Sequence, residues 1–189
     1  MTMRFAPIAA FVALGVTALA IPPVPRKSPE FVIQESPGKQ TLLSSFKGKV
    51  VVFALMYTTC PHCQREAVML TKLQGELGPR GLQVVGTTFD DSNPGKVANF
   101  VRQFNLGFPV GYSSTDTVMS YLGLSVMDRY VVPQIAVIDK KGMIRAQSEA
   151  TGTPDLQDEA FLRTLINNLL KEGATTTTSQ VKTAPKKAN

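Results

Sequence analysis

The sequence contains no tryptophan, and only one histidine and two cysteines among its 189 residues. Two cysteines and one histidine are too few ligands for a closed tetrahedral zinc site, and there is no second Cys-x-x-Cys pair. A cysteine hydrolase needs a histidine that faces its nucleophile from elsewhere in the fold. The single histidine, His62, instead lies between the two cysteines, so the sequence argues against both kinds of site.

Acidic residues are absent from both ends of the chain. Neither residues 1–29 nor residues 174–189 contain Asp or Glu, whereas each segment contains three Lys or Arg. These six residues account for the formal net charge of +6, and residues 30–173 are formally neutral. A basic face that follows phosphates is therefore not indicated, and we expect no nucleic-acid partner.

Residues 1–20 predict export from the cytoplasm. One Arg precedes an apolar run that closes with Ala18-Leu19-Ala20, which is typical of a secretory signal peptide with a small-residue cleavage site. The run is short for a membrane span, and an uncleaved anchor is the alternative. In either case we expect a periplasmic or secreted domain. A Pro-rich linker (21–29), a folded domain (30–173) and a disordered polar tail (174–189) follow.

Hydrophobic patterning within residues 30–173 predicts alternating strands and helices. The run KVVVFALMY (49–57) is continuously apolar and β-branched, as in a strand buried on both faces. We expect the closing helix to be capped by Thr153 or Asp155. This order indicates an α/β sheet with helices on both faces. The further expected elements are helices at 61–77, 94–105, 114–123 and 153–172, strands at 81–89 and 108–112, and hairpins within 31–46 and 134–150.

Both cysteines and the histidine lie in the stretch MYTTCPHCQRE (56–66). A disulfide between Cys60 and Cys63 would close a loop of four residues and would stabilise the fold very little. The pair is therefore better explained by its chemistry than by its contribution to stability. Inert buried cysteines are the remaining alternative.

Cys60 is expected where the strand ends and the helix begins. Amide N–H groups and the positive end of the helix dipole favour a thiolate there, so we expect Cys60 to be the attacking nucleophile. Cys63, one turn onward, can then resolve a mixed disulfide. His62 is expected to add charge or a hydrogen bond to the thiolate.

The central strand ending in Cys-Pro-His-Cys, the following amphipathic helix and the late Val-Pro before a hairpin resemble the thioredoxin-like superfamily. The extra strand–helix unit between the motif and the Val-Pro is similar to the TlpA-like extracytoplasmic thiol-disulfide oxidoreductases. The resemblance covers residues 30–173. It implies a thioredoxin-like fold with a central mixed β-sheet flanked by helices on both faces, an N-terminal β-hairpin and a strand–helix insertion.

The resemblance also assigns roles beyond the cysteines. Glu66 matches the active-site glutamate of TlpA-like proteins, where a buried carboxylate would take a proton from Cys63; a surface glutamate paired with a base is the alternative. Pro133 matches the proline that is cis in this fold, and Val132 would then face the cysteine pair and bind substrate. Pro61 and Thr59 are further expected substrate contacts, although Thr59 stands where the family usually has Trp.

The resemblance implies protein thiol or disulfide clients, including apocytochrome c, because several TlpA-like proteins serve cytochrome c maturation. It also implies a membrane redox partner. We expect a monomer with no metal and no cofactor other than the Cys60–Cys63 disulfide. A peroxiredoxin-like peroxidase and a copper or haem-thiol chaperone are the alternative functions. The Pro-His pair favours an oxidant and the TlpA-like resemblance a reductant, so the direction of exchange stays open.

Overall fold

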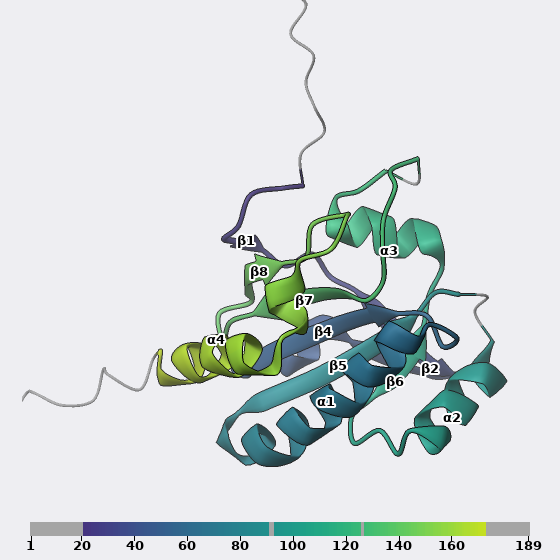
Figure 1. The fold of residues 1–189 in the computed structure, drawn as a ribbon, viewed down its shortest axis with the longest axis horizontal. Coiled ribbons are helices and arrows are strands. Elements are labelled where there is room, and N and C mark those ends of the chain that lie inside the picture. The colour runs from purple at the N-terminus through teal and green to yellow at the C-terminus, as the bar shows by residue number, and fades with distance from the viewer. Residues whose placement is uncertain (1–20, 91–92, 126, 173–189) are drawn as a thin grey trace, which may run out of the picture.

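The computed structural model describes residues 21–90, 93–125 and 127–172. In these ranges eight strands form one mixed sheet in the order β1-β8-β7-β4-β5-β6-β2-β3 (Figure 1). Strands β4, β5 and β6 are parallel, and the other neighbouring strands are antiparallel. The strands are β1 (Arg26–Lys27), β2 (Val32–Ser36), β3 (Lys39–Leu42), β4 (Val50–Met56), β5 (Leu82–Thr88), β6 (Val110–Tyr112), β7 (Gln134–Ile138) and β8 (Met143–Gln147).

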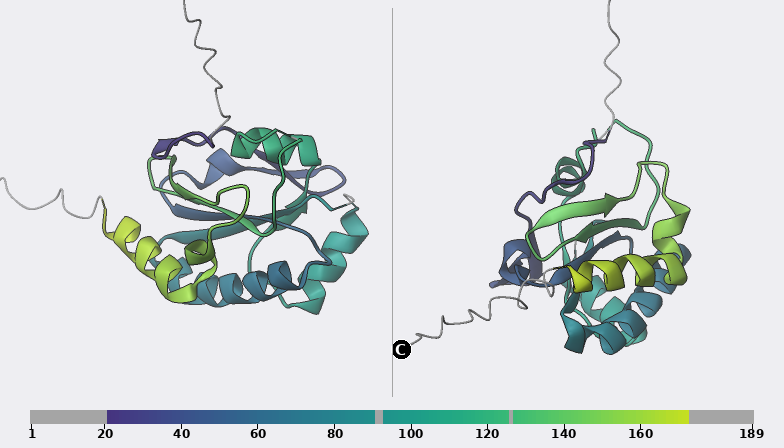
Figure 2. Two further views of the ribbon diagram at one scale, coloured as in Figure 1. Left: turned by 45° about the horizontal axis from the view of Figure 1, so that its top comes forward. Right: turned by 90° about the vertical axis from the view of Figure 1, so that its left-hand side faces the viewer.

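Helices cover both faces of the sheet, as the left view of Figure 2 shows. One face packs against α1, α2 and α4 around a core that includes Leu70, Phe100 and Ile166, and the other packs against α3 around Phe53 and Tyr121. The predicted thioredoxin-like α/β fold is thus confirmed. The helices of the described residues are α1 (Pro61–Leu77), α2 (Pro94–Gln103), α3 (Thr115–Leu122) and α4 (Glu159–Lys171), with short 3-10 turns at Leu43–Phe46, Gly78–Arg80 and Pro154–Gln157.

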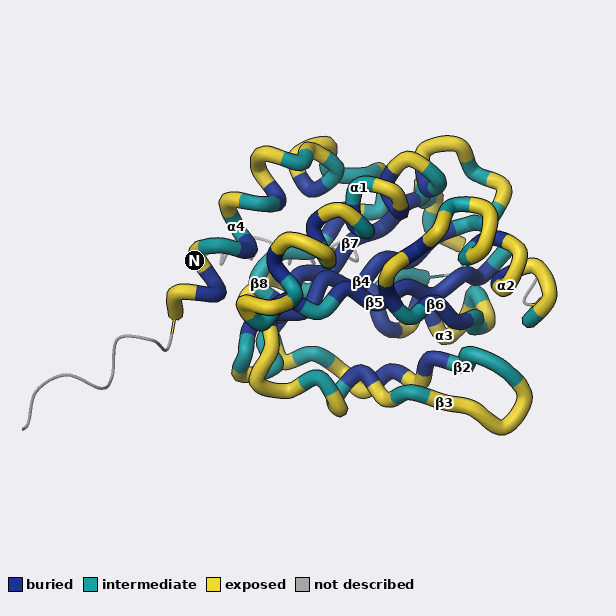
Figure 3. Tube along the Cα trace, turned by 90° about the horizontal axis from the view of Figure 1, so that it is seen from below, coloured by how far each residue is buried: buried dark blue, intermediate teal, exposed yellow. Residues whose placement is uncertain are grey.

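Strand β4 lies between β7 and β5, and all seven of its residues are buried (Figure 3). This position explains the unbroken apolar run, because both faces of the strand meet helices rather than water. Residues 57–60 connect the end of β4 to the start of α1. This short connection begins at a strand in the centre of the sheet, which fixes its position.

Two segments differ from the sequence-based expectation. Arg26 and Lys27 pair with Ile144 and Met143 as strand β1, so part of the expected linker belongs to the sheet. The predicted single helix over 153–172 is divided, because Asp158 adopts an extended conformation and its side chain accepts a hydrogen bond from the Phe161 N–H at the start of α4. The helix cap is therefore Asp158, and the prediction of Thr153 or Asp155 is wrong.

The expected signal segment (1–20) and polar tail (174–189) lie outside the described residues. Among the residues that the structure does describe, no helix combines the length and the apolar character needed to cross a bilayer.

Candidate active site

Cys60 is the residue that precedes the first turn of α1, with φ −79° and ψ 120°. Its N–H donates to the Tyr57 carbonyl (3.4 Å), and its carbonyl accepts from the Gln64 N–H (3.0 Å). Cys60 therefore stands at the positive end of the α1 dipole, which favours negative charge on its sulfur, although no N–H of the first turn donates to the side chain. Cys60 is partly exposed and carries a free thiol, as an attacking nucleophile requires.

Cys63 has a different environment, because its side chain is fully buried. The Tyr57 N–H donates to its sulfur over 3.4 Å. Burial raises the pKa of the Cys63 thiol far above its ordinary value, and the neighbouring Cys60 and Asp90 raise it further. The two thiols thus differ in the way that attack and resolution require, with one accessible to solvent and the other held protonated inside.

Glu66 lies one turn after Cys63 on the same helix and is only 5% exposed. Its Oε1 atom is buried and has no hydrogen-bond partner among the described residues. Burial raises the pKa of Glu66 to about 7. Glu66 is therefore buried rather than on the surface, and Lys72, a base further along the same helix, pairs with Glu159.

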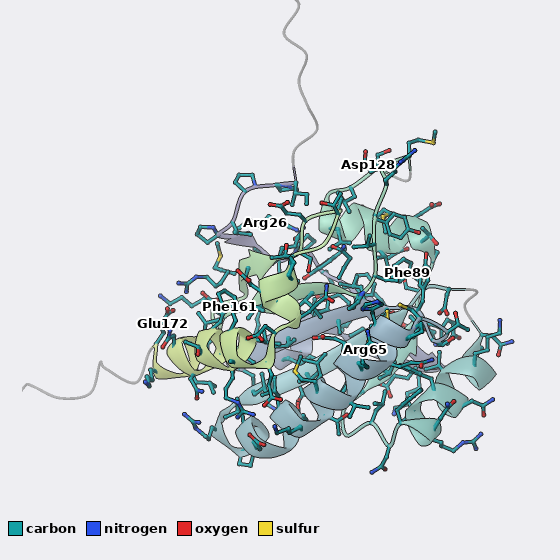
Figure 4. All side chains as sticks on the ribbon, viewed as in Figure 1. Arg26, Arg65, Phe89, Asp128, Phe161 and Glu172 are labelled. Atoms are coloured by element: carbon teal, nitrogen blue, oxygen red, sulfur yellow. The ribbon has the colours of Figure 1, made fainter. Side chains whose placement is uncertain are left out.

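His62 and Pro61 are exposed on the first turn of α1. The His62 Nδ1 atom accepts a hydrogen bond from the Arg65 guanidinium at 2.9 Å, one turn along the exposed side of the helix. Figure 4 shows Arg65 at this end of α1, close to where the sheet ends. Among the described residues His62 thus forms no hydrogen bond to the Cys60 sulfur, and a contribution of its charge to the thiolate stays a prediction.

The peptide bond between Val132 and Pro133 is cis, as the resemblance implies. The Val132 carbonyl oxygen lies 3.9 Å from the Cys60 sulfur and can accept the thiol proton. Next to it, the buried Gln134 side chain donates to the carbonyls of Val131 (2.8 Å), Glu149 (3.1 Å) and Ala150 (3.3 Å). Gln134 therefore ties the loop before β7 to the loop after β8.

These two loops and the start of α1 enclose a cavity of about 460 Å³. Val131 is 46% exposed at its wall and gives the cavity an apolar surface. The cavity lies next to the nucleophile, because it is lined by His62 and by Val132, whose carbonyl oxygen lies 3.9 Å from the Cys60 sulfur. Its lining is His62, Val131, Val132, Thr151, Gly152, Thr153, Pro154 and Gln157.

Sequence reasoning missed two parts of this site. Asp90, directly after β5, accepts hydrogen bonds from Thr58 and Thr59. The hydroxyls of Tyr57 and Tyr130 lie 2.7 Å apart and join the end of β4 to the loop before β7. A signal for Asp90 exists in the sequence, since parallel neighbouring strands end at one edge of a sheet. None exists for the tyrosine pair, which depends on the path of a loop.

Thr59 is exposed beside Cys60, and its N–H points at Asp90 over 3.4 Å. The resemblance leads us to expect Trp at this position, and Thr59 offers far less apolar surface. Among the described residues, no group of three or more His, Cys, Asp or Glu is placed to hold a metal ion. The reactive groups gathered here are the two thiols and the carboxyl group of Glu66.

Comparisons with known proteins agree with this geometry. The family described as Redoxin matches residues 23–166. The thiol-disulfide oxidoreductase ResA of Bacillus anthracis is 27% identical over 138 residues, which cover 73% of this chain and 76% of that protein. The protein of the same name from Geobacillus thermodenitrificans is 26% identical over 131 residues, covering 69% of this chain and 71% of the relative.

Solved structures share the fold at lower sequence identity. A thiol:disulfide interchange protein of the thioredoxin family from Chlorobium tepidum superposes with a TM-score of 0.65 at 21% identity, over 79% of this chain and 99% of that one. The thioredoxin domain of a thiol-disulfide oxidoreductase from Bacteroides vulgatus gives a TM-score of 0.62 at 18% identity, over 80% of this chain and 99% of that domain.

Proposed function

The chain belongs to the Redoxin family, and from this premise we propose that it is a thiol-disulfide oxidoreductase that exchanges disulfides with protein clients through Cys60 and Cys63. The observation that carries the proposal is the contrast between the two sulfurs. Cys60 is accessible at the start of α1, whereas Cys63 is fully buried one turn onward. Relatives that carry the name thiol-disulfide oxidoreductase support the same activity.

The reaction follows from these positions. The Cys60 thiolate attacks one sulfur of a client disulfide, so that a mixed disulfide forms and the other client sulfur leaves as a thiolate. Cys63 then loses its proton and attacks the Cys60 sulfur, which releases the second client thiolate and leaves a Cys60–Cys63 disulfide. Two electrons pass from the protein to the client. The reverse sequence oxidises a client dithiol.

Glu66 supplies the proton acceptor for the second step. Cys63 is protonated in the reduced protein because burial raises its pKa, so its attack requires a base. Glu66 lies on the same buried helix face three residues away, and a carboxyl group with a pKa of about 7 exchanges its proton near neutral pH. A fully exposed carboxylate, with a pKa near 4.5, would be a much weaker base.

The client segment would lie in the cavity beside Cys60. Val131 presents apolar surface there, the exposed Pro61 presents it on the first turn of α1, and Val132 offers backbone groups that an extended segment can pair with. The apolar segment 1–20 supports a site of action outside the cytoplasm. Apocytochrome c is a client that this location would allow, since several TlpA-like proteins serve cytochrome c maturation. A membrane protein would then be the redox partner that exchanges electrons with the Cys60–Cys63 pair.

Turnover of a disulfide-bonded protein such as insulin, with glutathione as electron donor, tests the proposal. We expect wild type to accelerate exchange, and Cys60→Ser and Cys63→Ser each to lose that acceleration. Phe161→Ala, an exposed position on α4, serves as the control and should keep wild-type turnover. The equilibrium between the protein and glutathione gives the direction of electron flow.

The same preparations decide between this function and its alternatives. Consumption of hydrogen peroxide without exchange of protein disulfides would favour a peroxidase. Binding of Cu(I) at sub-micromolar concentration without turnover of a disulfide client would favour a metal chaperone, with Cys60 and Cys63 as the ligands. Either outcome would contradict the proposed oxidoreductase.

A further inference from the structure

Asp90 contacts the thiol site from a part of the chain outside the cysteine motif. Met56 and Thr88 are register partners in the parallel pair β4 and β5. Thr58 and Asp90 each lie two positions further along and therefore meet at the same edge of the sheet. The Asp90 Oδ2 atom accepts hydrogen bonds from the Thr58 N–H (2.6 Å), the Thr58 hydroxyl (2.9 Å) and the Thr59 N–H (3.4 Å).

These bonds fix the two residues that directly precede Cys60. The turn itself contains one weak backbone bond, from the Cys60 N–H to the Tyr57 carbonyl at 3.4 Å. Two side chains hold the segment that presents the nucleophile: Gln64 donates to the Thr58 carbonyl at 3.0 Å, and the Asp90 carboxylate accepts from Thr58 and Thr59. The bonds to Asp90 are the stronger ones, because hydrogen bonds to a charged acceptor exceed neutral ones. The position of Asp90 is set by β5 rather than by the motif.

The second carboxylate oxygen of Asp90, Oδ1, is buried and has no hydrogen-bond partner among the described residues. The negative charge of this carboxylate interacts with other charged groups over several ångströms. Consistent with this, Asp90 contributes to raising the pKa of Cys63, after the larger effects of burial and of Cys60.

The groups that face Cys63 come from three elements. Cys60 and Glu66 belong to α1, Tyr57 lies at the end of β4, and Asp90 follows β5. Of these, the Tyr57 N–H stabilises a Cys63 thiolate, whereas burial, Cys60 and Asp90 all oppose it. Asp90 is therefore a source of negative charge that the thiol motif itself does not contain.

We propose that Asp90 is a positioning residue of the thiol pair: its carboxylate holds the Thr58–Thr59 turn, and with it Cys60, in place for attack. This inference rests on the proposed oxidoreductase function and adds a residue that sets the speed of the exchange.

Two substitutions test this role. Asp90→Asn keeps an oxygen that can accept from Thr58, whereas Asp90→Ala removes every acceptor. We expect Asp90→Ala to lower kcat for insulin by about tenfold, because the Thr58–Thr59 turn loses the acceptor of its three hydrogen bonds. Asp90→Asn should restore kcat to within about threefold of wild type, because its side-chain oxygen can still accept from Thr58.

Two control variants accompany the test. Glu76→Gln changes an acidic side chain in the last turn of α1, about 20 Å along the helix from Cys63, and should leave turnover unchanged. Thr58→Val removes the hydroxyl contact to Asp90 while the backbone contact and the charge remain. It should slow turnover modestly.

Turnover of Asp90→Ala within about twofold of wild type, or equal turnover of Asp90→Asn and Asp90→Ala, would overturn the proposal. If Asp90→Ala fails to fold, Thr58→Val still decides the effect of position, and wild-type turnover in that variant would overturn it. The rate of Cys60 alkylation, measured with Cys63→Ala as background, needs no client. It should fall in Asp90→Ala and not in Asp90→Asn even if exchange with glutathione proves absent in wild type, which would reject the proposed function alone.

Discussion

Cys63 and Glu66 lie one helical turn apart on the buried face of α1, with 0% and 5% of their surfaces exposed. A thiol and a carboxyl group thus share the same apolar environment, and burial raises the pKa of both. Both groups are protonated at acidic pH, and Glu66 is the first of the two to ionise as the pH rises. This order makes Glu66 the base for Cys63.

The buried carboxyl group predicts a specific dependence of stability on pH. In the unfolded chain Glu66 ionises near pH 4.5, and in the folded protein near pH 7, so the folded state holds the proton more tightly. The free energy of unfolding should therefore fall as the pH rises from about 4.5 to about 7, by an amount on the order of 3 kcal/mol. Above pH 7 this contribution should be constant.

Denaturant unfolding of the reduced protein at pH 5 and pH 8 measures this effect. Glu66→Gln, which cannot ionise, should lose less stability between the two values and be more stable than wild type at pH 8. Glu76→Gln, an exposed change on the same helix, should keep the wild-type dependence. Parallel pH curves for wild type and Glu66→Gln would contradict the assignment of the buried proton.

The same residue predicts the pH dependence of the resolving step. When Cys60 is first loaded with glutathione, attack by Cys63 releases that glutathione in a reaction that needs no client. In wild type the rate should rise through pH 7 as Glu66 ionises. Glu66→Gln should be slower by on the order of 100-fold at pH 8, since a positioned general base contributes at least that much. Equal rates in the two proteins would remove Glu66 from the mechanism.

Much of this architecture could be predicted from local sequence. The continuous apolar run from Val50 to Met56 predicts a strand that is buried on both faces. Pro61 marks the first position of the helix that follows it. These features place Cys60 at the start of α1 without any tertiary information. Glu66 could be placed beside Cys63 by helical spacing, although its burial depends on the packing of the sheet.

The remaining parts of the site depend on contacts between distant segments. The sequence indicates that β4 and β5 end at one edge of the sheet, but Asp90 meets Thr58 because of the register of these strands, which the sequence does not reveal. His62 was expected to act on Cys60, but Arg65 competes for its ring nitrogen on the exposed side of the helix. Likewise, several polar residues near the start of α4 are suitable helix caps. The backbone conformation of the preceding segment selects Asp158 among them.

Gln134 provides a test of the cavity wall. Its amide group donates to three backbone carbonyls and is fully buried. Gln134→Leu should lower the free energy of unfolding by about 1–3 kcal/mol, because those carbonyls lose their partner. It should also raise the KM for insulin more than it lowers kcat, since the loops that line the cavity loosen.

Denaturant unfolding and steady-state kinetics measure the two effects of Gln134→Leu. Gln40→Ala, an exposed change on the edge strand β3, is the matched control and should alter stability by less than about 0.5 kcal/mol. An unchanged KM in a destabilised Gln134→Leu protein would show that the cavity wall does not contact the client.

The tyrosine hydroxyl pair should behave as a coupled unit. Tyr57 and Tyr130 share one hydrogen bond of 2.7 Å, so Tyr57→Phe and Tyr130→Phe should each cost about 1 kcal/mol of stability. The double variant should cost less than the sum, because the second change removes a hydroxyl that has already lost its partner. Strict additivity in this double-mutant cycle would mean that the pair contributes no net stabilisation.

The most direct test of the division of roles between the two sulfurs is to treat Cys63→Ser and Cys60→Ser with oxidised glutathione and to weigh the intact proteins. The account predicts that Cys63→Ser acquires one stable glutathionyl group on Cys60, whereas Cys60→Ser acquires almost none, because Cys63 is fully buried and protonated. Equal labelling of the two variants, or labelling of Cys63 alone, would contradict it.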